Sequence, residues 1–236
     1  MEPDQTKSVA LEELTRAREH LWLFAGQVGH DLRTPLTAIL ANAEMLAAEP
    51  SVADDEELGW MVEGITRAAN RMNKMIEEML AYARQGGVPR VGVTDLDGVV
   101  RQALEDLAPV IAEADAEVTV DPLPTLRADP GQMYSVVRNL LSNAVKFARP
   151  GTPPRVRVRT EQLAGRWRVH VDDNGIGVDP DRREAMFVLF ARADKRVDGR
   201  GIGLATVRKL VEAHGGRVGM DEAPGGGTSV WFELPA

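Results

Sequence analysis

The chain has 236 residues, of which 44% are hydrophobic and 27% are charged, a composition typical of folded globular proteins rather than disordered ones. Its formal net charge of -8 argues against the Lys- and Arg-rich surface on which binding to nucleic acid phosphates depends, so we expect no nucleic acid partner. It contains no cysteine, which excludes disulfide bonds and thiolate metal sites.

The sequence contains no apolar run of the length, about 20 residues, that spans a bilayer, and its N-terminus lacks the apolar core of a signal peptide. We therefore expect a cytoplasmic chain that makes no membrane contact itself. Any sensory or membrane part of the natural protein is expected to lie outside this sequence.

The N-terminal third shows the apolar spacing of two amphipathic helices. Over residues 11–48 apolar side chains recur mainly at steps of three, four and seven, the spacing of one helical face. Pro50 then interrupts the pattern, and the acidic residues 54–57 suit the positive end of a new helix. Helical spacing resumes over residues 58–82, so the sequence predicts an antiparallel helical hairpin.

A two-helix hairpin with an apolar stripe on both arms buries too little surface to be stable alone. We expect it to pair with a second copy into a four-helix bundle, which makes the chain a homodimer. Periodicity alone is also compatible with a coiled-coil spacer that carries no chemistry.

After the Gly86–Pro89 segment the sequence changes to the alternating strands and helices of an α/β fold. Asp129 followed by Pro130 is typical of a helix start, with an N-cap acceptor and a proline at the first helical position. The predicted fold class is therefore α+β: a helical hairpin, then an α/β two-layer sandwich. The expected helices are 95–114, 129–148 and 202–213, and the expected strands are 91–93, 118–120, 156–158, 167–171, 217–220 and 228–234.

Asn139 and Asn143 lie one turn apart on the helix expected at 129–148, and Lys146 follows three residues later on the same face. Two amide oxygens and an ammonium group suit a metal ion and phosphates, because Mg²⁺ prefers oxygen ligands and shares them with substrate phosphates, and lysine serves as a point charge. The same spacing is also that of an ordinary exposed polar helix face.

Glycine-rich segments stand at three further places, of which the last is Gly225–Gly227, directly before Thr228. Asp173 precedes Gly175 and Gly177, which let a flat ligand approach the backbone closely, and its carboxylate can accept a hydrogen bond from an exocyclic amine. Gly201 and Gly203 precede a helix whose first N–H groups favour an anion such as a triphosphate. Taken singly, Asp-Asn-Gly is also a common turn after a strand, and Gly-x-Gly is common before helices.

In order and spacing, four motifs make the chain resemble the histidine kinase catalytic domain of the ATPase superfamily that also contains gyrase and mismatch-repair proteins. The N box corresponds to Asn139–Lys146, the G1 box to Asp173–Gly177, the F box to Phe187–Phe190 and the G2 box to Gly199–Leu204. With the hairpin included, the resemblance covers nearly the whole chain.

The resemblance implies an ATP site that also holds Mg²⁺. Asn139 and Asn143 would bind the metal ion and phosphate oxygens, and Asp173 would bind the adenine amine with the support of Thr228. Residues 191–200 would form a short mobile lid. Nucleotide-binding roles are implied for Asn139, Asn143, Lys146, Asp173, Gly175, Gly177, Arg192, Gly199, Arg200, Gly201, Gly203, Leu204 and Thr228.

Near the N-terminus, Gly29–Leu36 resembles the H box of dimeric histidine kinase bundles. The match identifies His30 as the nucleophile, Asp31 as the acceptor of the distal imidazole proton, and Thr34 as the residue that orients water when the bundle dephosphorylates its partner. Independently, Pro35 is costly in a plain helical spacer, because it removes a backbone hydrogen bond and bends the helix. The remaining histidines are interpreted as structural: His20, His170 and His214.

The function implied by this resemblance is that of a sensor histidine kinase core, a protein histidine kinase that uses ATP and Mg²⁺. Such a core phosphorylates its own His30, transfers the phosphoryl group to an aspartate of a response regulator receiver domain, and also dephosphorylates that regulator. Residues 1–86 would form the dimerisation and phosphotransfer hairpin, residues 87–91 a linker, and residues 92–236 the catalytic ATP-binding domain. The chain would act in the cytoplasm, alone or as part of a larger or membrane-bound sensor.

Two other classes of function stay open at this point. One is a nucleotide-driven ATPase clamp that forms no phosphoprotein intermediate, which the H box argues against. The other is a scaffold that binds ATP poorly and acts through dimerisation, which the intact N, G1 and G2 boxes argue against. Acid-labile, base-stable phosphate on the protein separates the kinase from both.

Overall fold

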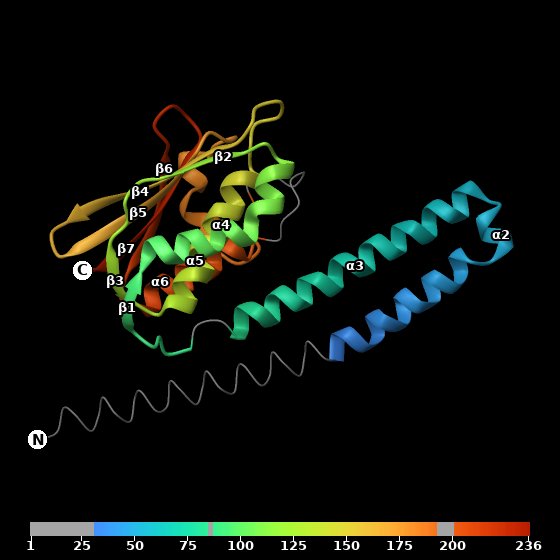
Figure 1. Ribbon diagram of the computed structural model, residues 1–236. Helices are drawn as coiled ribbons and strands as arrows, with labels where there is room; N and C mark the ends of the chain where they lie inside the picture. The colour runs from blue at the N-terminus through green and yellow to red at the C-terminus, as the bar shows by residue number, and fades with distance from the viewer. Residues whose placement is uncertain (1–30, 85–86, 193–200) are drawn as a thin grey trace, which may run out of the picture. The chain divides into compact units, whose positions relative to one another are not determined.

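A computed structural model describes residues 31–84, 87–192 and 201–236 of the chain. Figure 1 shows a helical N-terminal part and a C-terminal part in which helices pack on strands. The chain divides into two compact units, Met1–Arg84 and Gln85–Ala236. Within the described residues, no helix is both long and apolar enough to cross a membrane.

The first unit is a helical hairpin. Residues 31–47 are helical, a single turn α2 follows at Pro50–Ala53, and α3 extends over Glu56–Arg84. Figure 1 shows residues 31–47 and α3 side by side and running in opposite directions. The predicted hairpin is confirmed, with one helical turn inside the connection at Pro50.

The turn of the hairpin determines where α3 begins. Oδ1 of Asp55 accepts hydrogen bonds from the N–H groups of Glu57 and Leu58, at 3.0 and 3.1 Å, which have no partner within the helix. Glu56 and Glu57 occupy the first turn, where the helix dipole favours negative charge. Pro50 opens α2, a position at which no N–H donor is needed.

The hairpin has two sets of apolar side chains, of which one is buried. Leu36 and Ala43 on the first helix, and Val62 and Ala69 on α3, keep only 2–8% of their surface exposed, at the seven-residue spacing of a helix seam. The other set is exposed, and exposed apolar side chains in this number call for an explanation. Its members are at least 42% exposed: Leu32, Ile39, Met45, Leu46, Leu58, Trp60, Met61, Ile65, Met72, Met75 and Met79.

The second unit is built on a five-stranded sheet of order β2-β4-β5-β7-β6. β2 and β4 are parallel, and the other neighbouring strands are antiparallel. The turn that joins β4 to β5 contains Gly165 at a φ of 70°. In order of pairing, the strands are β2 (Glu117–Val120), β4 (Arg155–Leu163), β5 (Arg166–Asp173), β7 (Thr228–Pro235) and β6 (Arg217–Glu222).

Two further strands, β1 (Gly92–Asp95) and β3 (Thr125–Ala128), pair antiparallel in a small separate sheet. The sequence predicts β1 but not β3, because Pro122 and Pro124 directly precede a run of only four residues. The strand forms because its alternate residues Leu126 and Ala128 are buried, a gain that depends on the tertiary fold.

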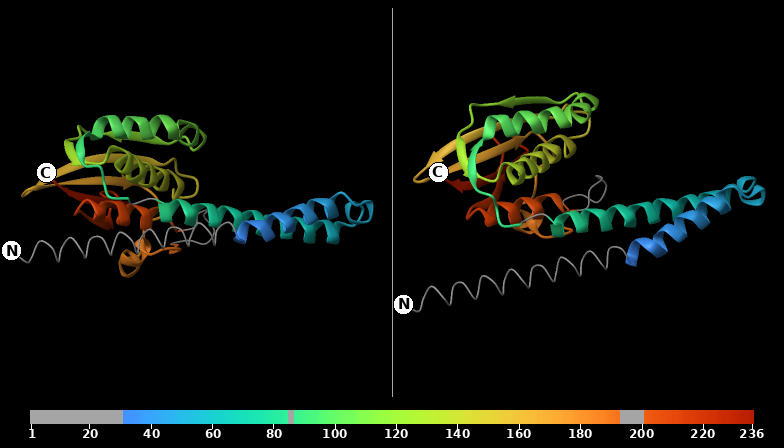
Figure 2. Two further views of the ribbon diagram at one scale, coloured as in Figure 1. Left: turned by 90° about the horizontal axis from the view of Figure 1, so that it is seen from below. Right: turned by 60° about the horizontal axis from the view of Figure 1, so that its bottom comes forward.

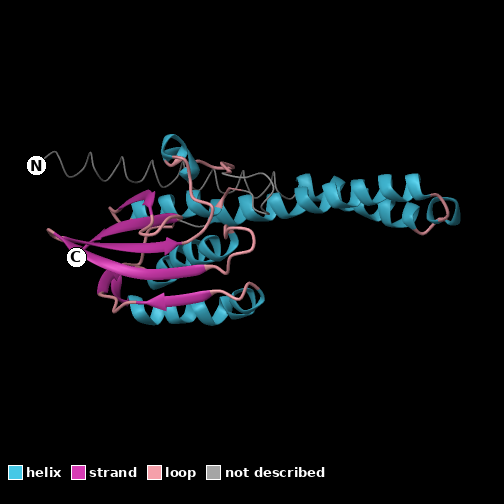
Figure 3. Cartoon of the chain, turned by 90° about the horizontal axis from the view of Figure 1, so that it is seen from above, coloured by secondary structure: helices cyan, strands magenta, loops and turns pink. Residues whose placement is uncertain are grey.

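Three helices lie together on one face of the five-stranded sheet (Figures 2 and 3). They are α4 (Leu96–Glu113), α5 (Pro130–Lys146) and α6 (Gly203–Ala213). Two short 3₁₀ helices, η1 (Pro180–Arg182) and η2 (Glu184–Phe187), lie between β5 and α6 in the chain. The layers confirm the predicted α/β sandwich.

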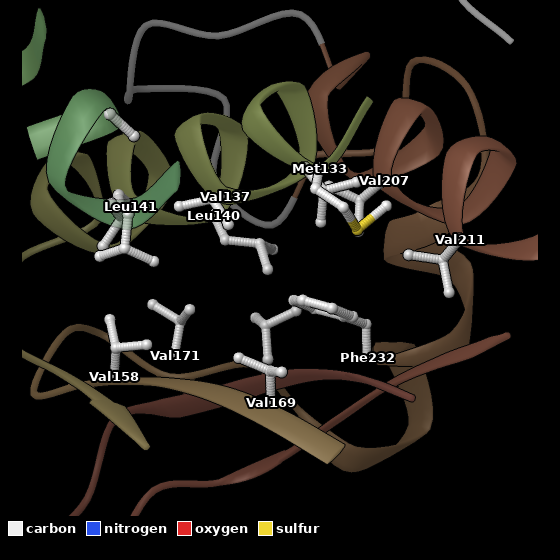
Figure 4. Packing of buried hydrophobic residues seen from close by; sticks show 14 of the residues in the cluster. Met133, Val137, Leu140, Leu141, Val158, Val169, Val171, Val207, Val211 and Phe232 are labelled. Carbon is white, nitrogen blue, oxygen red and sulfur yellow. The ribbon is translucent and has the colours of Figure 1, made fainter. Parts of the chain in front are cut away.

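The hydrophobic core fills the space between these helices and the sheet (Figure 4). Val169, Val171 and Phe232 point from the sheet toward the helices, and Leu140 of α5 and Val211 of α6 point back. All five keep at most 3% of their surface exposed. Because burial of a side chain of this size contributes about 1.5–3 kcal/mol, this layer holds α5 and the ends of the strands in fixed positions.

The start of α5 is tied to the end of α6. Oδ1 of Asp129 accepts a hydrogen bond from the N–H of Gln132 at 3.0 Å, the predicted N-cap. The N–H of Asp129 donates to Nε2 of His214 at 3.0 Å. Since Nε2 accepts, Nδ1 of His214 carries the proton and donates to the carbonyl oxygen of Leu210 at 2.8 Å. His214 therefore has the structural role predicted for it.

The opposite face of the sheet carries a buried polar network. His170 and Asp172 on β5 are only 5% and 8% exposed. Nε of Arg159 donates to Oδ2 of Asp172 at 2.6 Å, and Nδ1 of His170 lies 3.1 Å from both Nη2 of Arg159 and Oγ of Ser229. Nε2 of His170 is buried without a hydrogen bond among the described residues.

Burial lowers the pKa of His170 below its ordinary value of 6.5. The charges of Arg159 and Arg168 act in the same direction, while Asp172 and Glu161 oppose them. The folded chain therefore holds this imidazole neutral at neutral pH.

We predict that His170 makes the folded chain less stable in mild acid. Below about pH 6.5 the unfolded chain binds a proton on this residue that the folded chain resists, so the free energy of unfolding falls as pH decreases, by at most about 1.4 kcal/mol per pH unit. His170→Gln removes the contribution of this residue to the pH dependence of the free energy of unfolding. Urea unfolding of the parent and the variant between about pH 7.5 and 5.5 checks it, and parallel pH curves for the two proteins contradict it.

Candidate functional site

Asn139 and Asn143 lie one turn apart on α5, both half-buried. Nδ2 of Asn139 donates to the carbonyl oxygen of Ser135 at 2.7 Å, which leaves its Oδ1 on the side of Gly203 at the start of α6. A Cβ built on Gly203 would lie 3.1 Å from Oδ1 of Asn139 and 3.7 Å from Nδ2 of Asn143. The fold thus brings the N box and the G2 box together, and only a residue without a side chain leaves this space open.

Lys146 is the last residue of α5 and is exposed. Its Nζ lies 5.7 Å from the ring centroid of Phe147. Lys146 is three residues beyond Asn143, so it lies on the same helical face as the two asparagines.

Asp173 ends β5, and its carboxylate is held by two backbone donors. Oδ1 accepts hydrogen bonds from the N–H groups of Gly175 at 2.8 Å and Thr228 at 3.0 Å. Oδ2 accepts no hydrogen bond from the described part of the chain. The predicted support by Thr228 is therefore given by its backbone N–H group, and Oδ2 can accept a hydrogen bond from an amine.

Burial raises the pKa of Asp173 to about 6, although the N–H groups of Gly175 and Thr228 act to lower it. Asp172 adds to the increase, and Arg149 opposes it. The carboxylate is consequently ionised at neutral pH but becomes protonated in mild acid.

The loop after Asp173 packs closely against the C-terminal end of α5. The N–H of Ile176 donates to the carbonyl oxygen of Phe147 at 3.0 Å, and a Cβ on Gly175 would collide with that same oxygen. Gly177 has a φ of 76°, a conformation that residues with side chains rarely adopt. Both glycines are needed for the geometry of this loop.

A second glycine-rich turn reaches Asp173 from the other side. Gly225, Gly226 and Gly227 have φ angles of 93°, 90° and 97°. A Cβ on Gly227 would collide with the carbonyl oxygen of Asp173. This close approach places the N–H of Thr228 within hydrogen-bond distance of the carboxylate.

The G2 box begins α6 with a similar constraint. Gly201 has a φ of 70°, and a Cβ there would collide with the carbonyl oxygen of Ala191. Its own carbonyl oxygen accepts a hydrogen bond from the N–H of Phe190 at 2.9 Å, and Leu204 packs against the hydrophobic core. Gly199 and Arg200, together with most of the predicted lid, lie outside the described residues.

The F box is fixed to α6. Phe187 is 3% exposed, and the guanidinium carbon of Arg208 lies 4.9 Å from its ring centroid, while the same guanidinium pairs with Glu184. Arg192 is half-buried, and its carbonyl oxygen accepts a hydrogen bond from Nη2 of Arg182 at 2.9 Å.

Of the predicted hairpin site, the structure describes Asp31 and Thr34. Both lie within the helical residues 31–47 and are exposed. His30, with His20, lies outside the described residues. The helix passes through Pro35 without interruption.

Arg149 is a residue of the site that the motifs do not contain. Its Nε donates to the carbonyl oxygen of Gly175 at 2.8 Å. No signal in the sequence identifies it, because it follows the N box and contacts loops that are distant along the chain.

Together these groups provide a hydrogen-bond acceptor at one end of the site and amide oxygens, a lysine and a helix N-terminus at the other. The acceptor is Oδ2 of Asp173, and the anion-binding groups are on α5 and at the start of α6, where helix N–H groups favour negative charge. The arrangement suits a ligand with an amino-substituted ring and an anionic tail.

Two family models match the chain. Residues 23–87 match the family described as "His Kinase A (phospho-acceptor) domain". Residues 128–236 match the family described as "Histidine kinase-, DNA gyrase B-, and HSP90-like ATPase".

Individual proteins are also similar to the chain. It is 32% identical to "Phytochrome-like protein Cph1" of Synechocystis sp., over 94% of this chain and 30% of that protein. Among solved structures, it is 31% identical to "ShkA full-length in complex with AMPPNP", with a TM-score of 0.64 over 89% of this chain and 45% of that one. It is 32% identical to "Mycobacterial sensor histidine kinase MprB", with a TM-score of 0.53 over 61% of this chain and 97% of that one.

The chain spans only part of the curated relatives that it matches. It covers 30%, 29% and 51% of the length of three of them. The match to the mycobacterial structure, in contrast, covers nearly all of that solved chain.

We predict that Asp173 makes nucleotide binding depend on pH and on the amine of the base. The affinity for ADP should decrease when the pH falls below about 6, because a protonated Asp173 accepts a weaker hydrogen bond from the amine. Asp173→Asn should bind ADP about 10- to 100-fold more weakly at neutral pH, without this pH dependence.

Calorimetric titration with ADP between about pH 5.5 and 8 measures both effects. Purine riboside diphosphate, which lacks the amine, is the matched ligand, and its affinity should differ little between the parent and Asp173→Asn. An Asp173→Asn variant with the affinity and pH profile of the parent contradicts the assignment.

Proposed function

The chain belongs to the sensor histidine kinase family, and we propose that it transfers the γ-phosphoryl group of ATP to His30 and then to an aspartate of a response regulator receiver domain. It is thus a protein histidine kinase, with residues 1–86 as the dimerisation and phosphotransfer hairpin, residues 87–91 as a linker and residues 92–236 as the ATP-binding domain. The reaction takes place in the cytoplasm, where ATP is available.

The observation that carries the proposal is the geometry at Asp173. Its Oδ1 is occupied by two backbone N–H groups, so Oδ2 is directed to the ligand and accepts the adenine amine. With the base there, the phosphates extend toward Asn139, Asn143 and the start of α6. Lys146 and Arg192 contribute positive charge to them.

The residues on α5 suit a bound Mg²⁺ ion. Since Nδ2 of Asn139 is held by the carbonyl oxygen of Ser135, its Oδ1 is an oxygen ligand on the side of Gly203, and Asn143 supplies a second amide. Amide oxygens together with nucleotide phosphates are ligands that Mg²⁺ accepts. When bound, the ion would neutralise charge that develops on the phosphates.

Transfer of the phosphoryl group to the hairpin depends chiefly on a neutral imidazole and on its in-line position relative to the γ-phosphoryl group. One ring nitrogen of His30 attacks the γ-phosphorus, and ADP leaves with the electrons of the broken P–O bond. Asp31 accepts a hydrogen bond from the other ring nitrogen and stabilises the positive charge that develops on the ring as the P–N bond forms. We assign to Thr34, one turn further along, the role of orienting water when the bundle dephosphorylates the receiver domain.

The exposed apolar side chains of the hairpin support a homodimer. Leu32, Ile39, Met61 and Met72 belong to a set that is at least 42% exposed, and a second hairpin would cover it in a four-helix bundle. The receiver domain would then dock on the bundle near His30. We assign no nucleic acid partner and no membrane contact to the chain itself.

An ATPase clamp without a phosphoprotein intermediate is the alternative for an ATP site of this kind. The match of residues 23–87 to a phospho-acceptor family favours the kinase. Formation of phosphohistidine separates the two.

We predict that the parent chain, incubated with γ-labelled ATP and Mg²⁺, gains acid-labile, base-stable label, and that His30→Gln gains none. The reason is that His30 is the only histidine in the H box, and phosphohistidine is labile in acid and stable in base. His20→Gln is the matched control in the same hairpin and should keep the parental label. A parent that hydrolyses ATP without gaining label is a clamp, and that result overturns the kinase proposal.

We predict that Thr34→Ala lowers the phosphatase rate at least about tenfold, because it misplaces the attacking water, while autophosphorylation stays within about twofold of the parent. The measurement is loss of label from a receiver domain that this kinase has phosphorylated. Thr37→Ala is the control on the same helix, since Oγ1 of Thr37 bonds to the carbonyl oxygen of Arg33 at 3.0 Å. Full phosphatase activity in Thr34→Ala rejects the role.

A further inference from the structure

We propose that Arg149 is a positioning residue for adenine recognition, one that locks the two loops around Asp173 in the arrangement that presents Oδ2 to the base. The inference rests on the proposed function, because it concerns how the same site selects an adenine nucleotide. No motif contains this arginine, and the geometry points to it from two directions.

The first loop is held through its peptide group. Arg149 follows the C-cap of α5, Phe147, and its Nε donates to the carbonyl oxygen of Gly175 at 2.8 Å. The N–H of the same glycine donates to Oδ1 of Asp173 at 2.8 Å. Arg149 therefore holds the carbonyl group of Gly175, while the N–H group of Gly175 holds the carboxylate of Asp173.

The second loop is held through close packing. Gly226 has a φ of 90°, and a Cβ built on it would lie 2.9 Å from Nη2 of Arg149, so the guanidinium rests against its backbone. Two residues later, the N–H of Thr228 donates to the same Oδ1 of Asp173. Arg149 thus contacts both of the loops that supply a donor to this oxygen.

The charge of Arg149 acts on Asp173 as well. Burial is the largest influence on the pKa of Asp173 and raises it, and the positive charge of Arg149 is one of the effects that lower it. The other groups that act on Asp173 are the N–H groups of Gly175 and Thr228, which lower the pKa, and Asp172, which raises it. Loss of Arg149 should therefore move protonation of Asp173 toward neutral pH.

A purely structural role for Arg149 predicts a different result. An arginine that only stabilises two loops affects every nucleotide to the same degree and leaves the pH midpoint of binding unchanged. A positioning residue for the base affects ADP more than a nucleotide without the amine, and it moves that midpoint.

The test compares Arg149→Gln and Arg149→Lys with the parent chain. The control variant is Arg127→Gln, which removes an exposed arginine on β3. Affinities for ADP and for purine riboside diphosphate are measured by calorimetry between about pH 5.5 and 8.5, and circular dichroism verifies that each variant is folded.

For Arg149→Gln we expect about a tenfold loss of ADP affinity at pH 7, a smaller loss for purine riboside diphosphate, and a pH midpoint of ADP binding that is higher than that of the parent. Arg149→Lys should restore part of the midpoint, because it keeps the charge, but little of the affinity, because lysine cannot reproduce the planar contact with both loops. Arg127→Gln should match the parent.

The inference is overturned if Arg149→Gln loses affinity equally for both nucleotides with an unchanged pH midpoint, or loses no affinity at all. The proposed function is unaffected by either result as long as the parent chain binds ADP. A parent that binds no ADP contradicts the proposed function itself, and the inference falls with it.

Discussion

The hydrogen bonds that join Oδ1 of Asp173 to the N–H groups of Gly175 and Thr228 are the interaction on which the site depends. Thr228 is 55 residues beyond Asp173 in the chain, and the two meet because β5 and β7 are neighbours in the sheet. A carboxylate that is largely removed from water needs such donors, since an uncompensated buried charge is costly. The two donors fix its orientation and leave the other oxygen for a ligand.

The same strand connects this site to the stability of the domain. On β5, Val169 and Val171 pack against the helices, while His170 and Asp172 form a polar network on the opposite face. The alternation follows from strand geometry, and both faces restrain the end of the strand where Asp173 lies. A substitution in either layer is therefore able to affect nucleotide binding without touching the nucleotide.

Local sequence signals predicted the parts of the molecule that local chemistry controls. The start of α5 follows from Asp129 and Pro130, and the hairpin follows from its apolar spacing. Strand β3 was not predicted, because only tertiary burial of Leu126 makes four residues after two prolines extended. Arg149 was not predicted either, since its contacts arise when distant glycine loops fold onto the end of α5. Site roles that rest on family motifs, including those of His30 and Thr34, stay predictions.

We propose that ATP bound at Asp173 phosphorylates a histidine of the hairpin, and locating the phosphate tests this proposal. The chain is incubated with ATP and Mg²⁺, digested at alkaline pH, where phosphohistidine survives, and its peptides are sequenced by mass spectrometry. We predict one phosphoryl group on the peptide that contains His30. Phosphate on the peptides of His20, His170 or His214, or ADP formation without any phosphopeptide, would mean that His30 is not the phosphoryl acceptor.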